Sequence, residues 1–325
     1  MNFSVIIATH NRAPFISRAV DSALLQCKGA AEVIVVDDGS TDDTYARLKE
    51  KILNNKIIYL YQDNKGVSAA RNSGATLATG DYLVFLDSDD YFTANRCLSH
   101  LKYINNEDYA PDVVYSPWIT INQAGKILRI PGNEIPPNLL YPKLLVRGLA
   151  ALSACTFRKP AFIKSGGFNN ELKGCEDWEI IQKMVIANSR FLYCPVPSTV
   201  YVKHETNCSK NTMVMLQSAL KVVEIGFSSP AITKNTKDMY FRDGQVIQYL
   251  ETCRRLILAG NLNLTDKILS SLVEQYEPSK FWSAESISDE SRCEKFDKNR
   301  LIGNYRLILQ LRSTLEENIM KDFKF

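Results

Sequence analysis

The sequence predicts an α/β fold, in which a mostly parallel central sheet with flanking helices is followed by an α-helical C-terminal region. Three observations support this prediction. Strand-like and helix-like segments alternate four times within the first 104 residues, which is typical of a parallel sheet with helices on both faces. The strand-like segments are unbroken apolar runs, as expected for strands buried on both faces. Beyond residue 211, glycine becomes sparse and helical periodicity takes over.

The first half of the chain is the most regular. Its predicted strands are 3–9, 32–36, 56–61 and 82–86. The helices that follow them are 14–26, 42–54, 67–77 and 94–104. Pro14 suits the first turn of a helix, and Gly39 suits the tight turn before the second helix.

The second half is predicted to be less regular. Strands are expected at 112–118, 153–158, 190–194 and 199–204, with a hairpin at 118–122 and 126–130. Helices are expected at 141–147, 159–165, 173–188, 212–225, 238–258, 265–275 and 299–320, with a polar loop at 283–297. We therefore predict two domains, 1–210 and 211–325.

Composition excludes several classes of protein. The chain has 325 residues, 45% hydrophobic and 23% charged, as in soluble globular proteins. Its net charge of +3 gives no reason to expect nucleic acid as a partner. The eight cysteines show no C-x-x-C pair, so neither a zinc site nor a disulfide framework is indicated.

The same features suggest where the protein works. Scattered reduced thiols fit a cytoplasmic protein. The segment Met1–Val5 lacks the basic residues of a signal peptide and is interpreted as the first strand. No apolar run approaches the roughly 18 residues of a membrane helix. We expect a cytoplasmic protein whose membrane contact, if it has any, is peripheral at the inner face.

Polar residues follow the predicted strands at the ends where ligands bind open α/β sheets. They are Thr9 and Asn11; Asp37 and Asp38; and Asp87, Asp89 and Asp90. Asp87 and Asp89 are two apart, so they point to one side of an extended chain, whereas Asp90 points away and is expected only to brace the turn. Paired carboxylates suit Mg²⁺ or Mn²⁺ with positions open for phosphates. Taken alone, this motif fits a solvated acidic turn equally well.

Five ordered motifs extend the argument. They are Val5–Arg12, Asp37–Asp42, Gly66 with Ala70–Gly74, Phe85–Asp90, and Gly166–Phe168 with Glu176-Asp177. In this order they resemble the inverting glycosyltransferases of family 2, which have the GT-A fold. The resemblance covers about residues 3 to 210. It implies a nucleotide-sugar donor, most simply a UDP-sugar, a Mn²⁺ or Mg²⁺ ion, and transfer with inversion to a glycan or glycolipid acceptor of cell-surface polysaccharide synthesis.

The resemblance also assigns roles on the donor side. Thr9, Asn11 and Asp38 are expected along the nucleoside, with Asp38 on the base. Arg71 is expected to reach the uridine or the diphosphate. Asp87 and Asp89 match the family's DxD pair, and Asp89 is expected to bind the metal. His204 lies where a family histidine can join the metal, although a surface histidine fits its sequence context nearly as well.

On the acceptor side, Asp177 matches the family's catalytic base. Glu176 and Trp178 are expected to contact the acceptor, Trp178 by stacking on a sugar. From the residues alone, Glu176 and Asp177 also fit the first turn of any helix, and Trp178 fits core packing equally well.

The chain departs from the family pattern in two places. Ala8 and His10 stand where the family usually has Pro and Tyr, so the aromatic contact to the base falls to His10 or is weaker. The Gln-x-x-Arg-Trp signature of processive members is absent, which indicates the addition of a single sugar.

Two other functions remain open. One is a nucleotidyltransferase that makes the nucleotide-sugar, although the turn Thr9–Arg12 lacks the Gly-rich loop of that class. The other is a nucleotide-sugar-binding scaffold. The helical segment 211–325 is expected to form a homo-oligomer or to contact a partner or the membrane surface.

Overall fold

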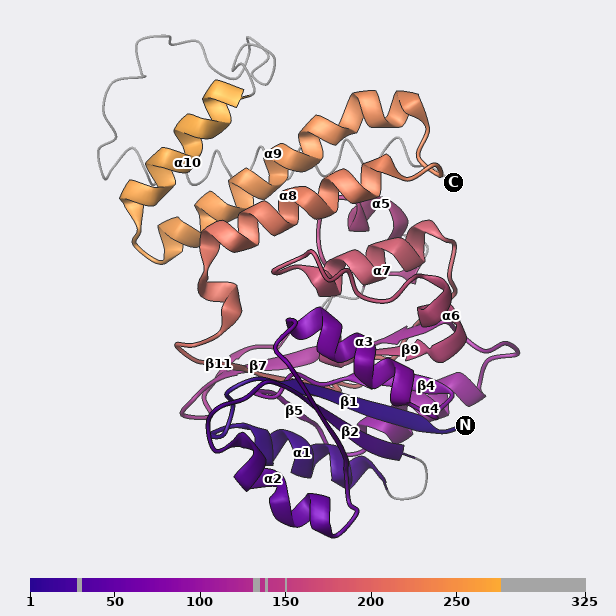
Figure 1. Cartoon of the computed structure of the whole chain (residues 1–325). Helices are drawn as coiled ribbons and strands as arrows, with labels where there is room; N and C mark the ends of the chain where they lie inside the picture. The colour runs from indigo at the N-terminus through magenta and orange to yellow at the C-terminus, as the bar shows by residue number, and fades with distance from the viewer. Residues whose placement is uncertain (28–30, 131–134, 138–139, 150, 276–325) are drawn as a thin grey trace. The chain divides into compact units, whose positions relative to one another are not determined.

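The computed structural model describes residues 1–275 apart from 28–30, 131–134, 138–139 and 150 (Figure 1). The chain divides into two compact units, one spanning Met1–Lys210 and the other beginning at Asn211. In the described part of the chain, no helix combines the length and apolar character needed to cross a membrane.

A seven-stranded sheet forms the centre of the first unit, in the order β10-β6-β9-β4-β1-β2-β3. Its strands are β1 (Phe3–Thr9), β2 (Ala31–Asp38), β3 (Ile58–Gln62), β4 (Tyr82–Phe85), β6 (Val113–Tyr115), β9 (Cys155–Arg158) and β10 (Phe191–Tyr193). The pairs are parallel except those of β9, which runs antiparallel to β4 and β6. The predicted mostly parallel sheet is therefore confirmed, and the reversed β9 is its one antiparallel member.

Helices flank this sheet. They are α1 (Ile16–Leu24), α2 (Thr44–Leu53), α3 (Val67–Leu77), α4 (Arg96–Asn105), α5 (Leu140–Leu144), α6 (Lys159–Lys164) and α7 (Glu176–Ile186). The predicted range of α3 is matched residue for residue, and the other helices of this unit begin or end a few residues from their predicted limits.

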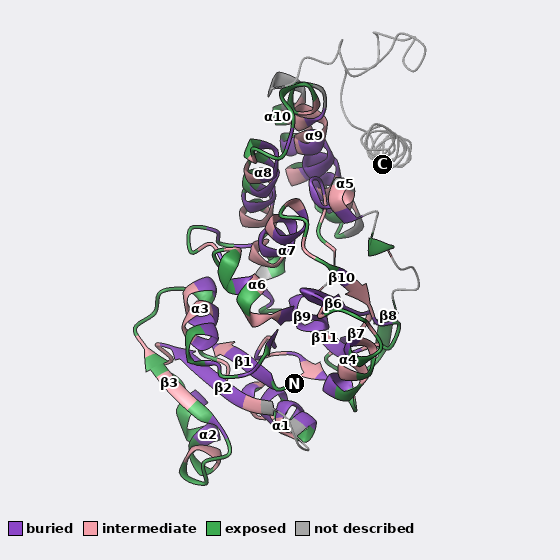
Figure 2. Ribbon diagram, turned by 90° about the vertical axis from the view of Figure 1, so that its right-hand side faces the viewer, coloured by how far each residue is buried: buried purple, intermediate pink, exposed green. Residues whose placement is uncertain are grey.

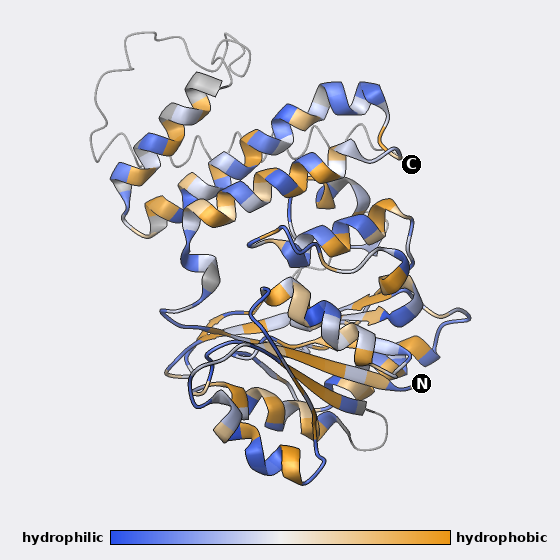
Figure 3. Ribbon diagram, in the orientation of Figure 1, coloured by the Kyte–Doolittle hydropathy of each residue, from blue (hydrophilic) through white to orange (hydrophobic). Residues whose placement is uncertain are grey.

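Strand β1 shows why helices pack on both faces. Val5 and Ile7 share a buried cluster with Val20 of α1, whereas Ile6 points to the other face, toward α3. There a Cβ on Gly74 would come within 2.4 Å of Ile6 Cγ2, so glycine lets α3 approach the sheet closely. Figure 3 shows the apolar residues concentrated in these central strands.

A second sheet was only partly predicted. It has the order β5-β11-β7-β8 and comprises β5 (Tyr91–Phe92), β7 (Trp118–Asn122), β8 (Ile127–Arg129) and β11 (Thr199–Lys203). The antiparallel β7–β8 hairpin is confirmed. The two-residue strand β5, and its pairing with β11, were missed because such a short strand depends on a distant partner.

The second unit is helical through Gln275. Its helices are α8 (Thr212–Ser228), α9 (Lys234–Leu258) and α10 (Leu262–Gln275), close to the predicted ranges. Leu216 of α8, Leu250 of α9 and Ile268 of α10 share one apolar cluster. The predicted helix 299–320 and loop 283–297 lie outside the described residues. Roles for this unit in oligomerisation or membrane contact stay predictions.

Candidate active site

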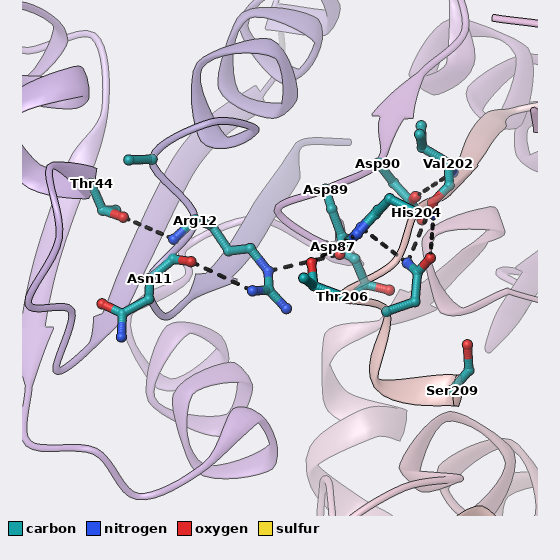
Figure 4. Close-up of polar contacts among 12 residues, drawn as sticks. Asn11, Arg12, Thr44, Asp87, Asp89, Asp90, Val202, His204, Thr206 and Ser209 are labelled. Atoms are coloured by element: carbon teal, nitrogen blue, oxygen red, sulfur yellow. Dashed lines mark hydrogen bonds and ion pairs between the residues drawn. The ribbon is translucent and has the colours of Figure 1, made fainter. Parts of the chain in front are cut away.

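The three carboxylates of the acidic turn after β4, those of Asp87, Asp89 and Asp90, contact different parts of the protein. Asp87 Oδ1 accepts a hydrogen bond from Arg71 of α3 at 2.6 Å, whereas Asp89 Oδ2 lies 2.9 Å from His204 Nε2 (Figure 4). Asp90 is buried, and its Oδ1 accepts a hydrogen bond from the Val202 backbone N–H at 2.9 Å. Burial, with the nearby charges of Asp87 and Asp89, raises the pKa of Asp90 well above its usual value. Asp90 therefore ties the acidic turn to β11, in keeping with its predicted bracing role.

That tie brings His204 to the acidic turn. His204 Nε2 lies 2.9 Å from Asp89 Oδ2, and its side chain is buried. Thr206 Oγ1 lies 2.9 Å from the other ring nitrogen, and Phe15 stacks on the ring with centroids 4.7 Å apart. The imidazole is thus held in place from three sides. His204 is therefore buried, and it is not the surface histidine that fitted its sequence context nearly as well.

Two arginines approach the same turn from the β1–α1 side. Arg12 Nε lies 3.8 Å from Asp89 Oδ2 (Figure 4). Arg18 donates to the Asp89 carbonyl at 2.9 Å and lies over the Tyr91 ring. Arg18 makes these contacts while remaining exposed, and the Arg12 side chain keeps 23% of its surface exposed. Sequence reasoning assigned neither residue a role.

Arg71 occupies a position that the sequence did not indicate. Its buried guanidinium bridges two carboxylates, with Nη2 2.6 Å from Asp87 Oδ1 and Nη1 2.8 Å from Glu176 Oε1. These two charges raise the pKa of Arg71 despite its burial. The bridge joins the turn after β4 to the start of α7. Contact of Arg71 with the uridine or diphosphate stays a prediction, and its observed partners are acidic side chains.

The loop before α7 is clamped from α3. Asn72 accepts from the Phe168 N–H at 3.0 Å and donates to its carbonyl at 2.8 Å. Gly167 has φ +66°, and a Cβ there would lie 2.7 Å from Asn72 Oδ1, so glycine is required. The Arg71 guanidinium in turn lies over the Phe168 ring, with its Cζ 5.4 Å from the ring centroid. These contacts explain why the Arg71-Asn72 and Gly166–Phe168 motifs occur together.

Asp177 lies in the first turn of α7 and is half-buried. Burial, together with the negative charge of Glu176, raises the pKa of Asp177 to about 7. The Trp178 N–H, which donates to Asp177 Oδ1 at 2.8 Å, and the charge of Arg71 oppose that rise. A carboxylate with this pKa can accept a proton near neutral pH.

The neighbouring tryptophan requires a correction. Trp178 is only 5% exposed, and its Nε1–H donates to the Leu144 carbonyl at 2.7 Å. Its side chain packs beside Gly148. The ring therefore belongs to the interior between α5 and α7 and offers no open face for the sugar stacking expected of it.

The residues expected along the nucleoside are engaged with nearby loops. The buried Asp38 carboxylate accepts hydrogen bonds from Gln62 Nε2 and from the backbone N–H groups of Lys65 and Gly66. Asn11, at φ 52°, accepts from the N–H of Thr41. These contacts order the rim of the site, and direct contacts to a base stay predictions.

Among the residues expected along the nucleoside, Thr9 has a hydroxyl group without a hydrogen-bond partner. Its Oγ1 is buried at the end of β1. His10, in the slot that the family usually fills with Tyr, has Nδ1 2.9 Å from the Asp38 carbonyl. The ring of His10 is thus held beside the residue expected to contact the base.

Asp89 and His204 form the pair of side chains best suited to a divalent ion. Within the described residues, no group of three or more His, Cys, Asp or Glu side chains is arranged to hold a metal. One carboxylate and one imidazole in contact nevertheless fit Mn²⁺ or Mg²⁺, because such ions keep several positions for water and substrate phosphates. The residues present therefore fit a metal that is shared with a phosphorylated ligand.

Solved structures place this fold in a class. The chain resembles Staphylococcus aureus TarS 1-349 in complex with UDP-GlcNAc, with a TM-score of 0.59 and 18% identity over 85% of this chain and 89% of that one. It also resembles the mannosyltransferase PcManGT from Pyrobaculum calidifontis in complex with GDP-Man and Mn²⁺, with a TM-score of 0.56 and 16% identity over 97% and 86%. The central sheet with its flanking helices is thus a GT-A fold.

Sequence comparison then identifies the family. The family model for glycosyl transferase family 2 matches residues 4–154. An uncharacterised glycosyltransferase of Rickettsia conorii is 32% identical over 54% of this chain, and the Escherichia coli chondroitin synthase is 30% identical over 56%. The family model and these relatives support a family 2 glycosyltransferase domain that includes residues 4–154. The chain spans only 30% of the length of the first relative and 26% of the second.

Proposed function

We propose that this protein transfers a sugar, with inversion, from a nucleotide-sugar to a hydroxyl group of a glycan or glycolipid in cell-surface polysaccharide synthesis. A UDP-sugar is the favoured donor, with Mn²⁺ or Mg²⁺ as cofactor. The observation that carries the proposal is the Arg71 bridge, which joins the DxD turn through Asp87 to the start of α7 through Glu176. It links the metal-binding turn to the helix that carries Asp177.

The chemistry follows from this arrangement. When bound, a divalent ion held by Asp89 and His204 supplies positive charge for the departing diphosphate. Asp177 takes the proton of the acceptor hydroxyl as the hydroxyl oxygen attacks the anomeric carbon. A single displacement from the face opposite the diphosphate inverts that carbon. Glu176 supports the base electrostatically, because its charge raises the pKa of Asp177.

Ligand stabilisation tests the donor and metal assignments. With a nucleotide-sugar at a hundredfold above its Kd, the melting temperature should rise by about 5 °C, and more with Mn²⁺ than without it. Asp89→Asn should remove the metal-dependent part because it weakens a metal ligand. Asp108→Asn, an exposed change after α4, is the control. If no UDP- or GDP-sugar raises the melting temperature of the wild-type protein, the proposed function is wrong.

Arg12 supplies positive charge to the diphosphate in this proposal. Arg71 is engaged by two carboxylates, whereas Arg12 lies beside Asp89 with part of its side chain exposed. Arg12→Gln should weaken UDP binding about tenfold, since a charge-assisted hydrogen bond is lost, and should leave uridine binding unchanged. Calorimetry with both ligands measures the difference.

The matched control for Arg12 is Lys51→Gln. Lys51 is 24% exposed and makes one ion pair, with Asp21, in the last turn of α2. Its loss should leave both affinities unchanged. Equal weakening of uridine and UDP by Arg12→Gln would show that Arg12 only shapes the loop.

A further inference from the structure

We propose that the edge of the second sheet binds the surface of an anionic lipid bilayer. The surface consists of residues 126–130, which contain β8 and are named here the β8 edge. This inference does not depend on the proposed sugar transfer.

The β8 edge exposes apolar side chains on both of its faces. Ile127 is 57% exposed, Leu128 48% and Ile130 56%. Because side chains alternate along a strand, Ile127 and Leu128 point to opposite faces of the sheet. All three residues of β8 are exposed (Figure 2), so neither face is covered by the rest of the unit.

Basic residues alternate with this apolar group. Lys126 and Arg129 are both exposed, and the segment 118–130 contains no Asp or Glu. A projecting strand with aliphatic and cationic side chains matches the two parts of an anionic membrane surface. The aliphatic groups enter the boundary of the acyl chains, and the cations meet the lipid phosphates.

The small size of the surface favours a bilayer over a protein partner. Its three aliphatic side chains expose on the order of 300 Å² together, against about 800 Å² per partner in a stable protein interface. Lys126 and Arg129 also oppose the addition of another strand at this edge, since charged residues there discourage sheet pairing. A bilayer requires neither a complementary shape nor strand pairing.

Vesicle sedimentation of the full chain tests the proposal. We expect binding to vesicles of equal parts phosphatidylglycerol and phosphatidylcholine, and much weaker binding to phosphatidylcholine alone. The double variant Ile127→Ser/Leu128→Ser should lower the bound fraction about fivefold by removing apolar insertion, and Lys126→Gln/Arg129→Gln should remove the dependence on salt. Circular dichroism melting verifies that each variant is folded.

The control exchanges equally exposed aliphatic residues elsewhere. Leu53 and Ile163 are 70% and 60% exposed, and Leu53→Ser/Ile163→Ser should leave vesicle binding unchanged. Absence of wild-type binding to anionic vesicles, or equal binding by the wild type and both β8 edge variants, would overturn the proposal. So would a β8 edge variant that turns an oligomer into a monomer, by sedimentation velocity, while its lipid binding stays the same.

Discussion

Asp177→Asn should lower the rate of sugar transfer about a thousandfold, because the variant loses the carboxylate that accepts the hydroxyl proton. Donor binding should be retained, since the amide has nearly the same size. Initial rates of transfer and calorimetry with the donor measure the two effects separately. Glu179→Gln is the matched control, because Glu179 is a buried carboxyl of the same helix that pairs with Lys183. Transfer at the wild-type rate by Asp177→Asn would remove Asp177 as the base.

The pH profile gives this prediction a second readout. The base must be deprotonated, and the pKa of Asp177 is raised to about 7. The rate should therefore rise with pH through about 7 and level off above it, instead of levelling off near pH 4 as for an ordinary aspartate. Glu176→Gln removes the neighbouring negative charge and should move this rise to lower pH. A profile that is flat between pH 5 and 8 would contradict the assignment.

Arg71→Leu should lower the free energy of unfolding by about 2–3 kcal/mol. Removing one partner of a buried ion pair costs about 3–5 kcal/mol when the remaining charge stays buried. Here Asp87 and Glu176 keep 36% and 15% of their side-chain surface exposed. Water can therefore hydrate the carboxylates left unpaired, which makes the loss of stability smaller than for a fully buried pair. Urea denaturation measures the change. The rate of transfer should also fall, because the start of α7 loses its link to the acidic turn.

The control for Arg71 is an arginine on the surface. Arg47 is exposed on α2, and Arg47→Leu should change the free energy of unfolding by less than about 0.5 kcal/mol. The triple variant Arg71→Leu/Asp87→Asn/Glu176→Gln should recover part of the stability, because no unpaired carboxylate remains. If Arg71→Leu unfolds at the same urea concentration as wild type, the bridge does not stabilise the fold.

Local patterns predicted the part of the site that lies on regular elements. The apolar run of β4 ends at Asp87, and the strand-helix alternation placed that end on the same sheet edge as Thr9 and Asp38. Such predictions succeed because a buried parallel strand must be apolar along its length and polar where it ends. His204 was named from the family motif alone, and no local signal indicated what it contacts.

Other features could not be predicted from local patterns. Arg71 resembles any solvated helix residue until Asp87 and Glu176 are brought to it from 16 and 105 residues away. Trp178 fitted both a sugar platform and the core, and only the carbonyl of Leu144, supplied by α5, decides for the core.

The sequence by itself thus determined the parallel sheet, its acidic edge and the resemblance to family 2 glycosyltransferases, because hydrophobic periodicity and motif order are local properties of the chain. The tertiary structure alone decided which side chains the acidic edge contacts. The second sheet sets His204 against Asp89, and the Arg71 bridge connects Asp87 to the helix of Asp177. Charge pairing and burial depend on residues far apart in the chain, so they exist only once the strands have paired.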